Sequence, residues 1–233
     1  MRLAHKDFHF IMPLAEASVT VLVLERSDSF RKYVAELSRQ CDGKEGGFVI
    51  SKNWEPVSLS GSALILTDLF DIEINSKKQL TVLYKKMNQI AISPSFVRET
   101  EAIKNALSTW LMYIENELPV PVIHDLDISI ADILKSCGIH FDYNEASIPD
   151  VLEMIVKVCA GFLCIPILIC IGLHDILDEK ELISLYKEAE YEKLSILDIE
   201  RHCPEYRHPK EKTFILDKDL CEIYNESDEN SSD

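Results

Sequence analysis

The stretch Val19-Thr-Val-Leu-Val-Leu24 decides the fold class, because every position except Thr20 is apolar. A strand with one face in water alternates apolar and polar residues, whereas a strand covered on both faces is apolar throughout. A helical pattern follows over residues 29–40, and Ala63-Leu-Ile-Leu-Thr67 has the same strand character. Covered strands that alternate with helices predict an α/β head with a mostly parallel sheet.

The same alternation returns late in the chain, after a helix that opens with Ser147 and Asp150 in capping-box spacing. The later elements are a strand at 166–171, a helix from Asp178 to about Glu190, and strands at 194–199 and 213–216. The head is therefore expected in two parts, residues 1–70 and 147–224.

Residues 71–146 between these parts have helical periodicity and predict an inserted α-helical arm, with helices over 75–90, 97–117 and 129–137. Apolar residues of the second helix recur at helical spacing and define one face. They are Ile103, Ala106, Leu107, Trp110, Leu111, Ile114 and Leu118. The polar, acidic tail 225–233 is expected to be disordered.

Cysteine usage and hydropathy predict a cytoplasmic protein. The seven cysteines form no C-x-x-C pair and lie largely in apolar sequence, which indicates buried thiols in a reducing compartment. The uncharged run 158–173 is short for a membrane span and has Pro166 at its centre, so it is better interpreted as a helix end that leads into a strand.

The net charge of −16 argues against nucleic acid, but the charge is unevenly distributed. Residues 1–110 contain 14 Lys and Arg against 13 Asp and Glu, whereas residues 111–233 contain 10 against 27. The acidity limits where DNA could bind and does not forbid it.

Phosphate-binding and catalytic motifs are absent from the sequence. No glycine belongs to G-x-x-x-x-G-K-[ST] or G-x-G-x-x-G, and there is no G-x-S-x-G or H-E-x-x-H. His174-Asp175 follows a strand end, where α/β sites often lie, but no nucleophile accompanies it. An enzyme has little support from these residues.

The 25 residues between Glu73 and Glu99 contain no acid and include Lys77, Lys78, Lys85 and Lys86. On a helix these lysines share one face, and the apolar residues share the opposite face. A solvated helix face would account for this pattern, although such faces usually mix both signs of charge. The alternative is a face that follows DNA phosphates.

The next window is acidic and contains no Lys or Arg between Lys104 and Lys135. Its acids are Glu115, Glu117, Asp125, Asp127 and Asp132. Carboxylates that converge from helix ends are typical ligands of Ca²⁺. The other interpretation is that Asp132 completes a capping box with Ser129 and that the remaining acids are solvated.

The order of these features resembles the small adaptation protein of type II-A CRISPR systems. The resemblance is carried by Val21-Leu-Val-Leu-Glu25 with Phe30, Leu66 to Ser76, Glu115-Asn-Glu-Leu118, Asp132 to Ile139, Pro166 to Ile171, the helix from Asp178, and Phe214 to Asp217. It covers nearly the whole chain apart from the acidic tail.

The resemblance implies a degenerate P-loop-like head and a non-enzymatic homotetrameric ring that takes the ends of double-stranded DNA through a lysine-lined channel, with Ca²⁺ supporting assembly. By motif position, Lys77, Lys78, Lys85 and Lys86 correspond to channel cations, with Lys52 as a weaker candidate. Glu117, Asp125, Asp127 and Asp132 correspond to the calcium-associated stretch. The implied partners are the CRISPR integrase pair and the effector nuclease.

Two rival hypotheses stay open. One is a metal-dependent α/β hydrolase or phosphoryl-transfer enzyme that uses Asp68 and Asp71, because carboxylates at the end of a buried strand are often catalytic. The other is a protein-interaction module built on a nucleotide-binding fold that has lost its ligand.

Overall fold

The computed structural model describes residues 1–125, 127–143 and 145–224. The chain divides into two compact units. The head unit consists of Met1–Ile72 and the segment that starts at Tyr143, and the arm unit is Glu73–Asp142. The sequence places these boundaries at residues 70 and 147. The tail 225–233 lies outside the described residues.

A six-stranded sheet forms the centre of the head unit, in the order β10-β9-β3-β8-β7-β6. All neighbouring strands are parallel except the pair β9 and β10. The strands are β3 (Val19–Leu24), β6 (Ala63–Leu66), β7 (Ile167–Ile171), β8 (Ser195–Glu200), β9 (Glu211–Leu216) and β10 (Glu222–Ile223). The predicted α/β class with a mostly parallel sheet is confirmed.

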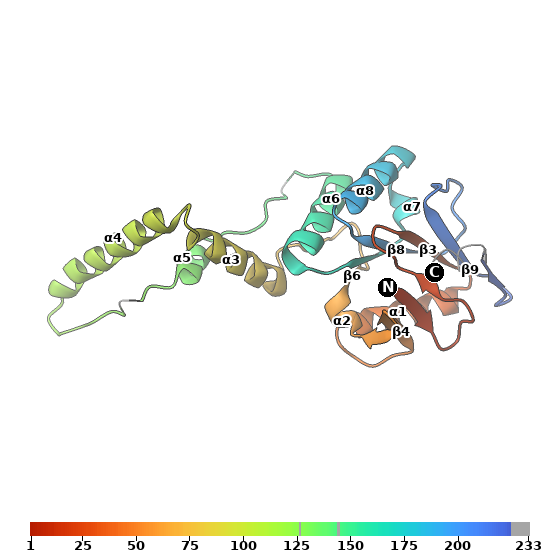
Figure 1. Cartoon of the computed structure of the whole chain (residues 1–233), viewed down its shortest axis with the longest axis horizontal. Coiled ribbons are helices and arrows are strands. Elements are labelled where there is room, and N and C mark those ends of the chain that lie inside the picture. The colour runs from red at the N-terminus through yellow and green to blue at the C-terminus, as the bar shows by residue number, and fades with distance from the viewer. Residues whose placement is uncertain (126, 144, 225–233) are drawn as a thin grey trace. The chain divides into compact units, whose positions relative to one another are not determined.

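Strand β3 is buried at all six positions because it lies inside the sheet and helices cover both faces. Helix α1 lies on one face, and helices α6 and α8 lie on the other (Figure 1). The helices are α1 (Ser27–Cys41), α6 (Ile148–Lys157) and α8 (Glu179–Tyr191). Each contributes buried leucines, among them Leu37, Leu152 and Leu185.

A second, four-stranded antiparallel sheet in the head unit was not predicted, and its order is β2-β1-β4-β5. Its strands are β1 (Arg2–His5), β2 (Met12–Pro13), β4 (Phe48–Lys52) and β5 (Glu55–Val57), followed by the short helix α2 (Leu59–Ser62). Strands of two to five residues are too short for an alternating pattern to stand out. Aromatic packing stabilises this region, with the rings of Phe8 and Tyr33 4.7 Å apart.

The apolar run 158–173 is the end of a helix followed by a central strand, as the sequence predicted. Helix α6 continues into the π-helix η1 (Val158–Leu163), and Cys164 in the left-handed region, with φ 53°, ends it before β7. A short helix, α7 (Leu173–Ile176), follows β7. In the described part of the chain, every helix is too short or too polar to cross a bilayer.

The expectation of buried thiols is wrong for part of the set. Cys159 and Cys170 are buried, whereas Cys137, Cys164 and Cys221 are exposed. The exposed thiols occupy turns and loop ends, where local hydropathy does not determine burial.

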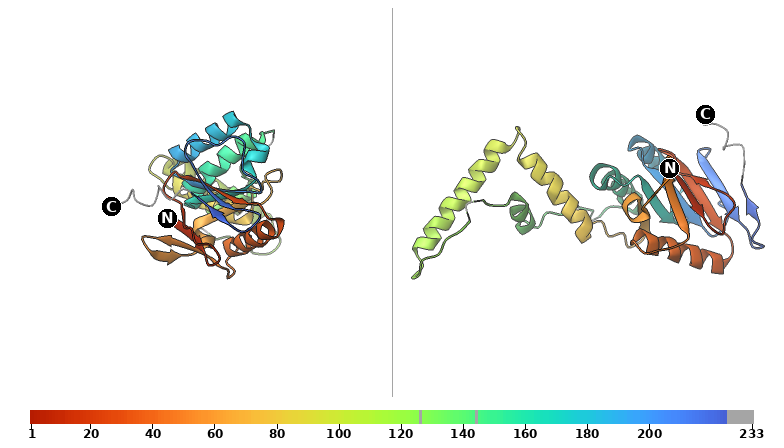
Figure 2. Two further views of the ribbon diagram at one scale, coloured as in Figure 1. Left: turned by 90° about the vertical axis from the view of Figure 1, so that its right-hand side faces the viewer. Right: turned by 60° about the horizontal axis from the view of Figure 1, so that its bottom comes forward.

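The arm unit contains three helices, α3 (Lys77–Ala91), α4 (Val97–Asn116) and α5 (Ile130–Ser136). Residues 92–96 join α3 to α4, which form two separate rods (Figure 2). Helix α5 packs on α3. The Tyr84 hydroxyl on α3 donates to the Ile139 carbonyl at 2.9 Å, and the Asn75 side chain exchanges two hydrogen bonds with the Phe141 backbone, at 3.0 and 2.8 Å.

Candidate nucleic-acid interface

Helix α3 has a capped N-terminus and one apolar stripe along its length. The Gln79 side chain accepts a hydrogen bond from the Ser76 N–H at 3.0 Å. Because a backbone N–H at a helix N-terminus has no partner within the helix, this bond satisfies a donor that would otherwise be unpaired. Gln79 and Leu83 are the buried residues of α3. The apolar stripe therefore faces the arm unit's interior, and the opposite face is available to solvent.

The four lysines of α3 define the lysine face: Lys77, Lys78, Lys85 and Lys86. All four side chains are exposed, and none of their ammonium groups forms an ion pair with a described residue. Other exposed lysines do have acidic partners, as in the 2.6 Å pair between Lys32 and Asp7. The lysine face is thus an uncompensated concentration of positive charge. Lys52 is also exposed, but it belongs to β4 in the head unit.

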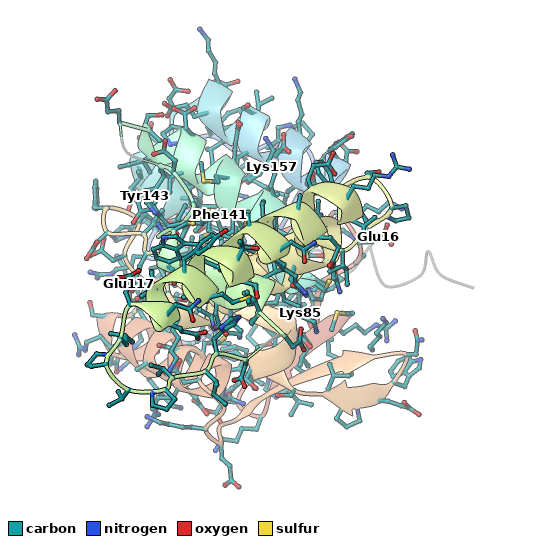
Figure 3. All side chains as sticks on the ribbon, turned by 90° about the vertical axis from the view of Figure 1, so that its left-hand side faces the viewer. Glu16, Lys85, Glu117, Phe141, Tyr143 and Lys157 are labelled. Carbon is teal, nitrogen blue, oxygen red and sulfur yellow. The ribbon has the colours of Figure 1, made fainter. Side chains whose placement is uncertain are left out.

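The predicted metal ligands occupy three places in the arm unit. Glu117 follows the end of α4, Asp125 and Asp127 lie in the loop after it, and Asp132 lies in the first turn of α5. Figure 3 marks Glu117, and Lys85 on α3. All four acids are exposed, and the structure does not gather three of them within mutual ligand distance.

Two of these four acids form ion pairs with lysines of the arm unit. Asp132 binds Lys135 at 2.9 Å, and this pair, together with Ser129, lowers the pKa of Asp132. Ser129 caps α5 by accepting from the Asp132 N–H at 3.3 Å, which is one half of a capping box. Asp127 lies 3.8 Å from Lys104. The structure thus contains the Ser129 half of the capping box that the sequence offered as an alternative to metal binding, and the Asp132 carboxylate pairs with Lys135 instead of completing it.

A hydrogen-bonded network that the sequence did not predict fixes the loop after α4. His124 Nδ1 lies 2.8 Å from Glu115 Oε1, and its Nε2 lies 2.8 Å from Ser108 Oγ. Both partners belong to α4. The position of His124 in the sequence does not predict these two contacts, because they form only after the chain reverses direction beyond α4. The loop that carries Asp125 therefore runs back along α4.

The predicted apolar face of α4 is largely exposed in this single chain. Ile103, Trp110 and Ile114 are 55%, 58% and 41% exposed, and Thr100 is the buried residue of the helix. Exposed apolar patches of this kind are typical of surfaces that contact another protein, a membrane or a ligand. Tyr113, three residues after Trp110 on the same helix and 70% exposed, extends the patch.

The N-terminus of α1 occupies the position after β3 where a P-loop would bind phosphate. In this chain, the carboxylate of Asp28 lies in the first turn of α1. Asp28 pairs with Arg26 at 2.6 Å and accepts from the Ser29 N–H at 2.9 Å, and these two interactions bring the pKa of Asp28 to about 2. A carboxylate at this position opposes binding of a nucleotide phosphate.

Asp68 and Asp71, the residues of the enzyme hypothesis, are exposed and close together in a turn after β6. Asp68 accepts hydrogen bonds from the N–H groups of Phe70 and Asp71 at 2.9 and 3.3 Å. This is the arrangement of an Asx turn, in which the side chain shapes the backbone.

The head unit contains a buried cluster of polar side chains, and only one of its members was identified from the sequence. His174 was singled out, but its partners Asp198, Glu200 and Glu211 were not. The signal was the pair of acids two residues apart in the otherwise apolar run Ser195–Glu200, which places both on one face of β8.

Burial disfavours protonation of His174, but its hydrogen bonds to Asp198, Glu200 and Glu211 outweigh burial and raise its pKa to about 11. Burial, together with the charge of Glu200, raises the pKa of Asp198 to about 8. Burial also opposes ionisation of Glu200, but the hydrogen bonds from His174 and Asp198 lower its pKa overall.

Comparison with known proteins gives one family match. The family model described as CRISPR-associated protein (Cas_Csn2) matches residues 40–220. None of the curated proteins matches this chain. Among solved structures, a putative ABC transporter ATP-binding protein from Pyrococcus furiosus is similar at 11% sequence identity and a TM-score of 0.40, over 91% of this chain and 97% of that chain.

Proposed function

This chain belongs to the Cas_Csn2 family of CRISPR-associated proteins, and on that premise we propose that it binds the ends of double-stranded DNA during spacer acquisition. The single observation that carries the proposal is the lysine face, which has four exposed ammonium groups and no acidic partner among the described residues. Binding is independent of sequence, because these groups are suited to phosphates and not to base edges.

The dimensions of the lysine face agree with a phosphate backbone. Lys77 and Lys86 are nine residues apart, which corresponds to about 14 Å along a helix. One DNA strand places a phosphate roughly every 3.4 Å along the duplex axis, so the face spans about four phosphates. Neutralising them releases counterions and makes the affinity steeply dependent on salt.

The exposed apolar face of α4 supports assembly with further copies of this chain. A second copy is the occupant we propose, because Trp110 and Tyr113 are of the type that anchors protein interfaces and are 58% and 70% exposed. A homotetrameric ring would surround a duplex with four lysine faces. Closed circular DNA could not thread such a ring, which would make binding specific for ends.

Calcium is proposed to support this assembly through Glu117, Asp125, Asp127 and Asp132. Their carboxylate oxygens have the chemistry that Ca²⁺ prefers. Asp132 would have to exchange Lys135 for the ion. Since the four carboxylates are spread over a helix end, a loop and a helix start, ion binding would draw these segments together and stiffen the arm unit.

The proposed role is that of a non-enzymatic scaffold that passes its DNA to the CRISPR integrase pair and the effector nuclease. The Asp28 carboxylate at the N-terminus of α1 and the turn geometry of Asp68 support a role without nucleotide hydrolysis. The scaffold would act in the cytoplasm.

A gel-shift assay with linear and closed circular duplexes of one sequence tests this function, each with Ca²⁺ or with a chelator. We expect a shift for the linear duplex in Ca²⁺, a weaker shift with the chelator, and little shift for the circle. Linearising the circle with a restriction enzyme is the matched control and should restore binding. Equal binding to linear and circular DNA would contradict end recognition, and no binding to either would contradict the proposed function.

A further inference from the structure

The head unit contains a buried cluster of one imidazole and three carboxylates that the proposed DNA-binding role does not use. His174 lies at the start of α7, where Gly172, with φ 77°, turns the chain back over the sheet. Its Nδ1 lies 2.9 Å from Asp198 Oδ2 and 3.3 Å from Glu200 Oε1. The side chains of His174, Asp198 and Glu200 are 6%, 0% and 3% exposed.

These three side chains form a compact donor set. In the described residues, theirs is the one group of three or more His, Cys, Asp or Glu side chains whose ligand atoms lie within 4.8 Å of one another. Tetrahedral coordination with bonds of about 2.0–2.1 Å places neighbouring ligand atoms roughly 3.3 Å apart. The 3.3 Å separation equals that spacing, and the 2.9 Å separation, which is a hydrogen-bond distance, would have to lengthen when the ion binds.

The remaining ring nitrogen faces a carboxylate, as in many metal-bound histidines. His174 Nε2 lies 3.2 Å from Glu211 Oε1, which also accepts from the Tyr186 hydroxyl at 3.1 Å. A carboxylate that accepts from Nε2–H fixes the ring orientation and leaves Nδ1 unprotonated for the metal. Glu211 would thus position the imidazole.

The ligand carboxylates are themselves held by backbone donors. The Leu173 N–H donates to Asp198 Oδ1 at 3.2 Å, and the His174 N–H donates to Glu200 Oε1 at 2.9 Å. Such contacts orient metal-binding carboxylates and restrict their rotation.

One polar atom of the cluster lacks a partner. Glu211 Oε2 is buried and accepts no hydrogen bond from any described residue, although the Glu211 side chain is only 1% exposed. Among the described residues, Asp198, Glu200 and Glu211 each form an ion pair with His174. One imidazolium lies among three acids in this cluster. A divalent cation would add positive charge there and displace the protons that His174 Nδ1 and Asp198 hold in its absence.

We propose that His174 Nδ1, Asp198 Oδ2 and Glu200 Oε1 bind a divalent transition-metal ion of the Zn²⁺ type, with Glu211 as the residue that positions the imidazole. Zn²⁺ is favoured over Ca²⁺ because imidazole nitrogen suits the former and Ca²⁺ takes oxygen ligands. The ion would join α7 to β8 and would stabilise the head unit. It is separate from the calcium ligands proposed in the arm unit.

The test uses the full-length, tag-free protein after removal of metals by a chelator and dialysis. Zn²⁺ is titrated calorimetrically, metal content is measured by mass spectrometry, and thermal unfolding is followed with and without Zn²⁺. We expect one Zn²⁺ per chain and a higher unfolding midpoint in its presence. Absence of bound Zn²⁺ from the folded protein would overturn the proposal.

Variants connect the ion to the cluster. His174→Gln and Glu200→Gln should each weaken Zn²⁺ binding at least tenfold, whereas His5→Gln, at a buried histidine that pairs with Glu36 instead, should leave it unchanged. Unchanged Zn²⁺ affinity in folded His174→Gln would place the ion elsewhere and refute the assignment.

A spectroscopic readout on the unaltered protein covers the case in which these variants fail to fold. Co²⁺ bound at the cluster should show the strong visible absorption of four-coordinate cobalt. A spectrum identical to that of aqueous Co²⁺ would contradict the proposed site.

Discussion

The head unit and the arm unit place apolar and charged side chains in opposite ways. In the head unit, large apolar side chains such as Leu22 and Leu152 are fully buried, and the buried acids Asp198 and Glu200 are hydrogen-bonded. In the arm unit, Trp110 is 58% exposed and the lysine face has no acidic partner among the described residues. The head unit is organised by contacts within itself, whereas the arm unit presents surfaces that suit other molecules.

The largest difference between the two units should appear in the loss of unfolding free energy when an apolar side chain of each unit is shortened to alanine. Leu22→Ala removes a fully buried side chain from β3, and we expect it to lower the free energy of unfolding by about 2–5 kcal/mol. Ile103→Ala on α4 removes a side chain that is 55% exposed and should cost less than about 0.5 kcal/mol under conditions in which the chain is monomeric.

Urea denaturation of both variants measures this difference. Equal losses would mean that the α4 face is packed within the single chain, which would remove the distinction between the two units.

A charge on the exposed apolar face should weaken self-association. Trp110→Glu is expected to raise the dissociation constant for assembly at least tenfold, because anchoring aromatic residues contribute about 2 kcal/mol or more to an interface. Sedimentation velocity measures the assembly. Lys180→Glu on α8, an exposed position in the head unit, is the control and should assemble as the unaltered protein does. An unchanged assembly of Trp110→Glu would exclude this face as the interface.

Helix caps should differ in strength between the units. Ser147 and Asp150 form a complete capping box at α6, so Ser147→Ala should cost about 1 kcal/mol of stability. Ser129 forms half of a box at α5, and Ser129→Ala should cost less. Thermal unfolding compares the two variants, and a larger loss for Ser129→Ala would contradict the geometry.

The smallest expected effect is a pH dependence from His5. Burial lowers the pKa of His5, although Glu36 and Asp7 oppose this and Lys32 adds to it. Because the folded pKa lies below the unfolded value, this histidine contributes stability above about pH 6.5, and the contribution is lost as the pH falls through that value toward the folded pKa.

The change in unfolding free energy between pH 7.5 and 5.5 should therefore be smaller in His5→Gln than in the unaltered protein. An identical pH dependence in the two proteins would show that His5 titrates normally in the folded state.

Sequence patterns were sufficient for the parallel sheet and the arm helices, because both rest on periodicity within one element. Residues 19–24 and 97–117 were predicted within one residue of β3 and α4. Patterns were insufficient where distant segments meet. The antiparallel pairing of β1 with β4 joins residues more than 40 positions apart, and the cluster at His174 on α7 gathers acids from strands β8 and β9.

The lysine face was also predicted from local sequence, since it depends on the periodicity of one helix and on the absence of acidic residues from positions 74–98. Its exposure agrees with that prediction, and its role in DNA binding remains the central proposal.

The most direct test of that proposal is the affinity of Lys78→Glu/Lys85→Glu for a linear duplex, measured by fluorescence anisotropy at several salt concentrations. The matched control is Lys180→Glu/Lys187→Glu, which changes the net charge equally on exposed lysines of α8. We predict that the α3 variant loses at least about tenfold in affinity and has a shallower salt dependence, while the control stays within about threefold. Equal affinities of the two variants would contradict the assignment of DNA binding to the lysine face.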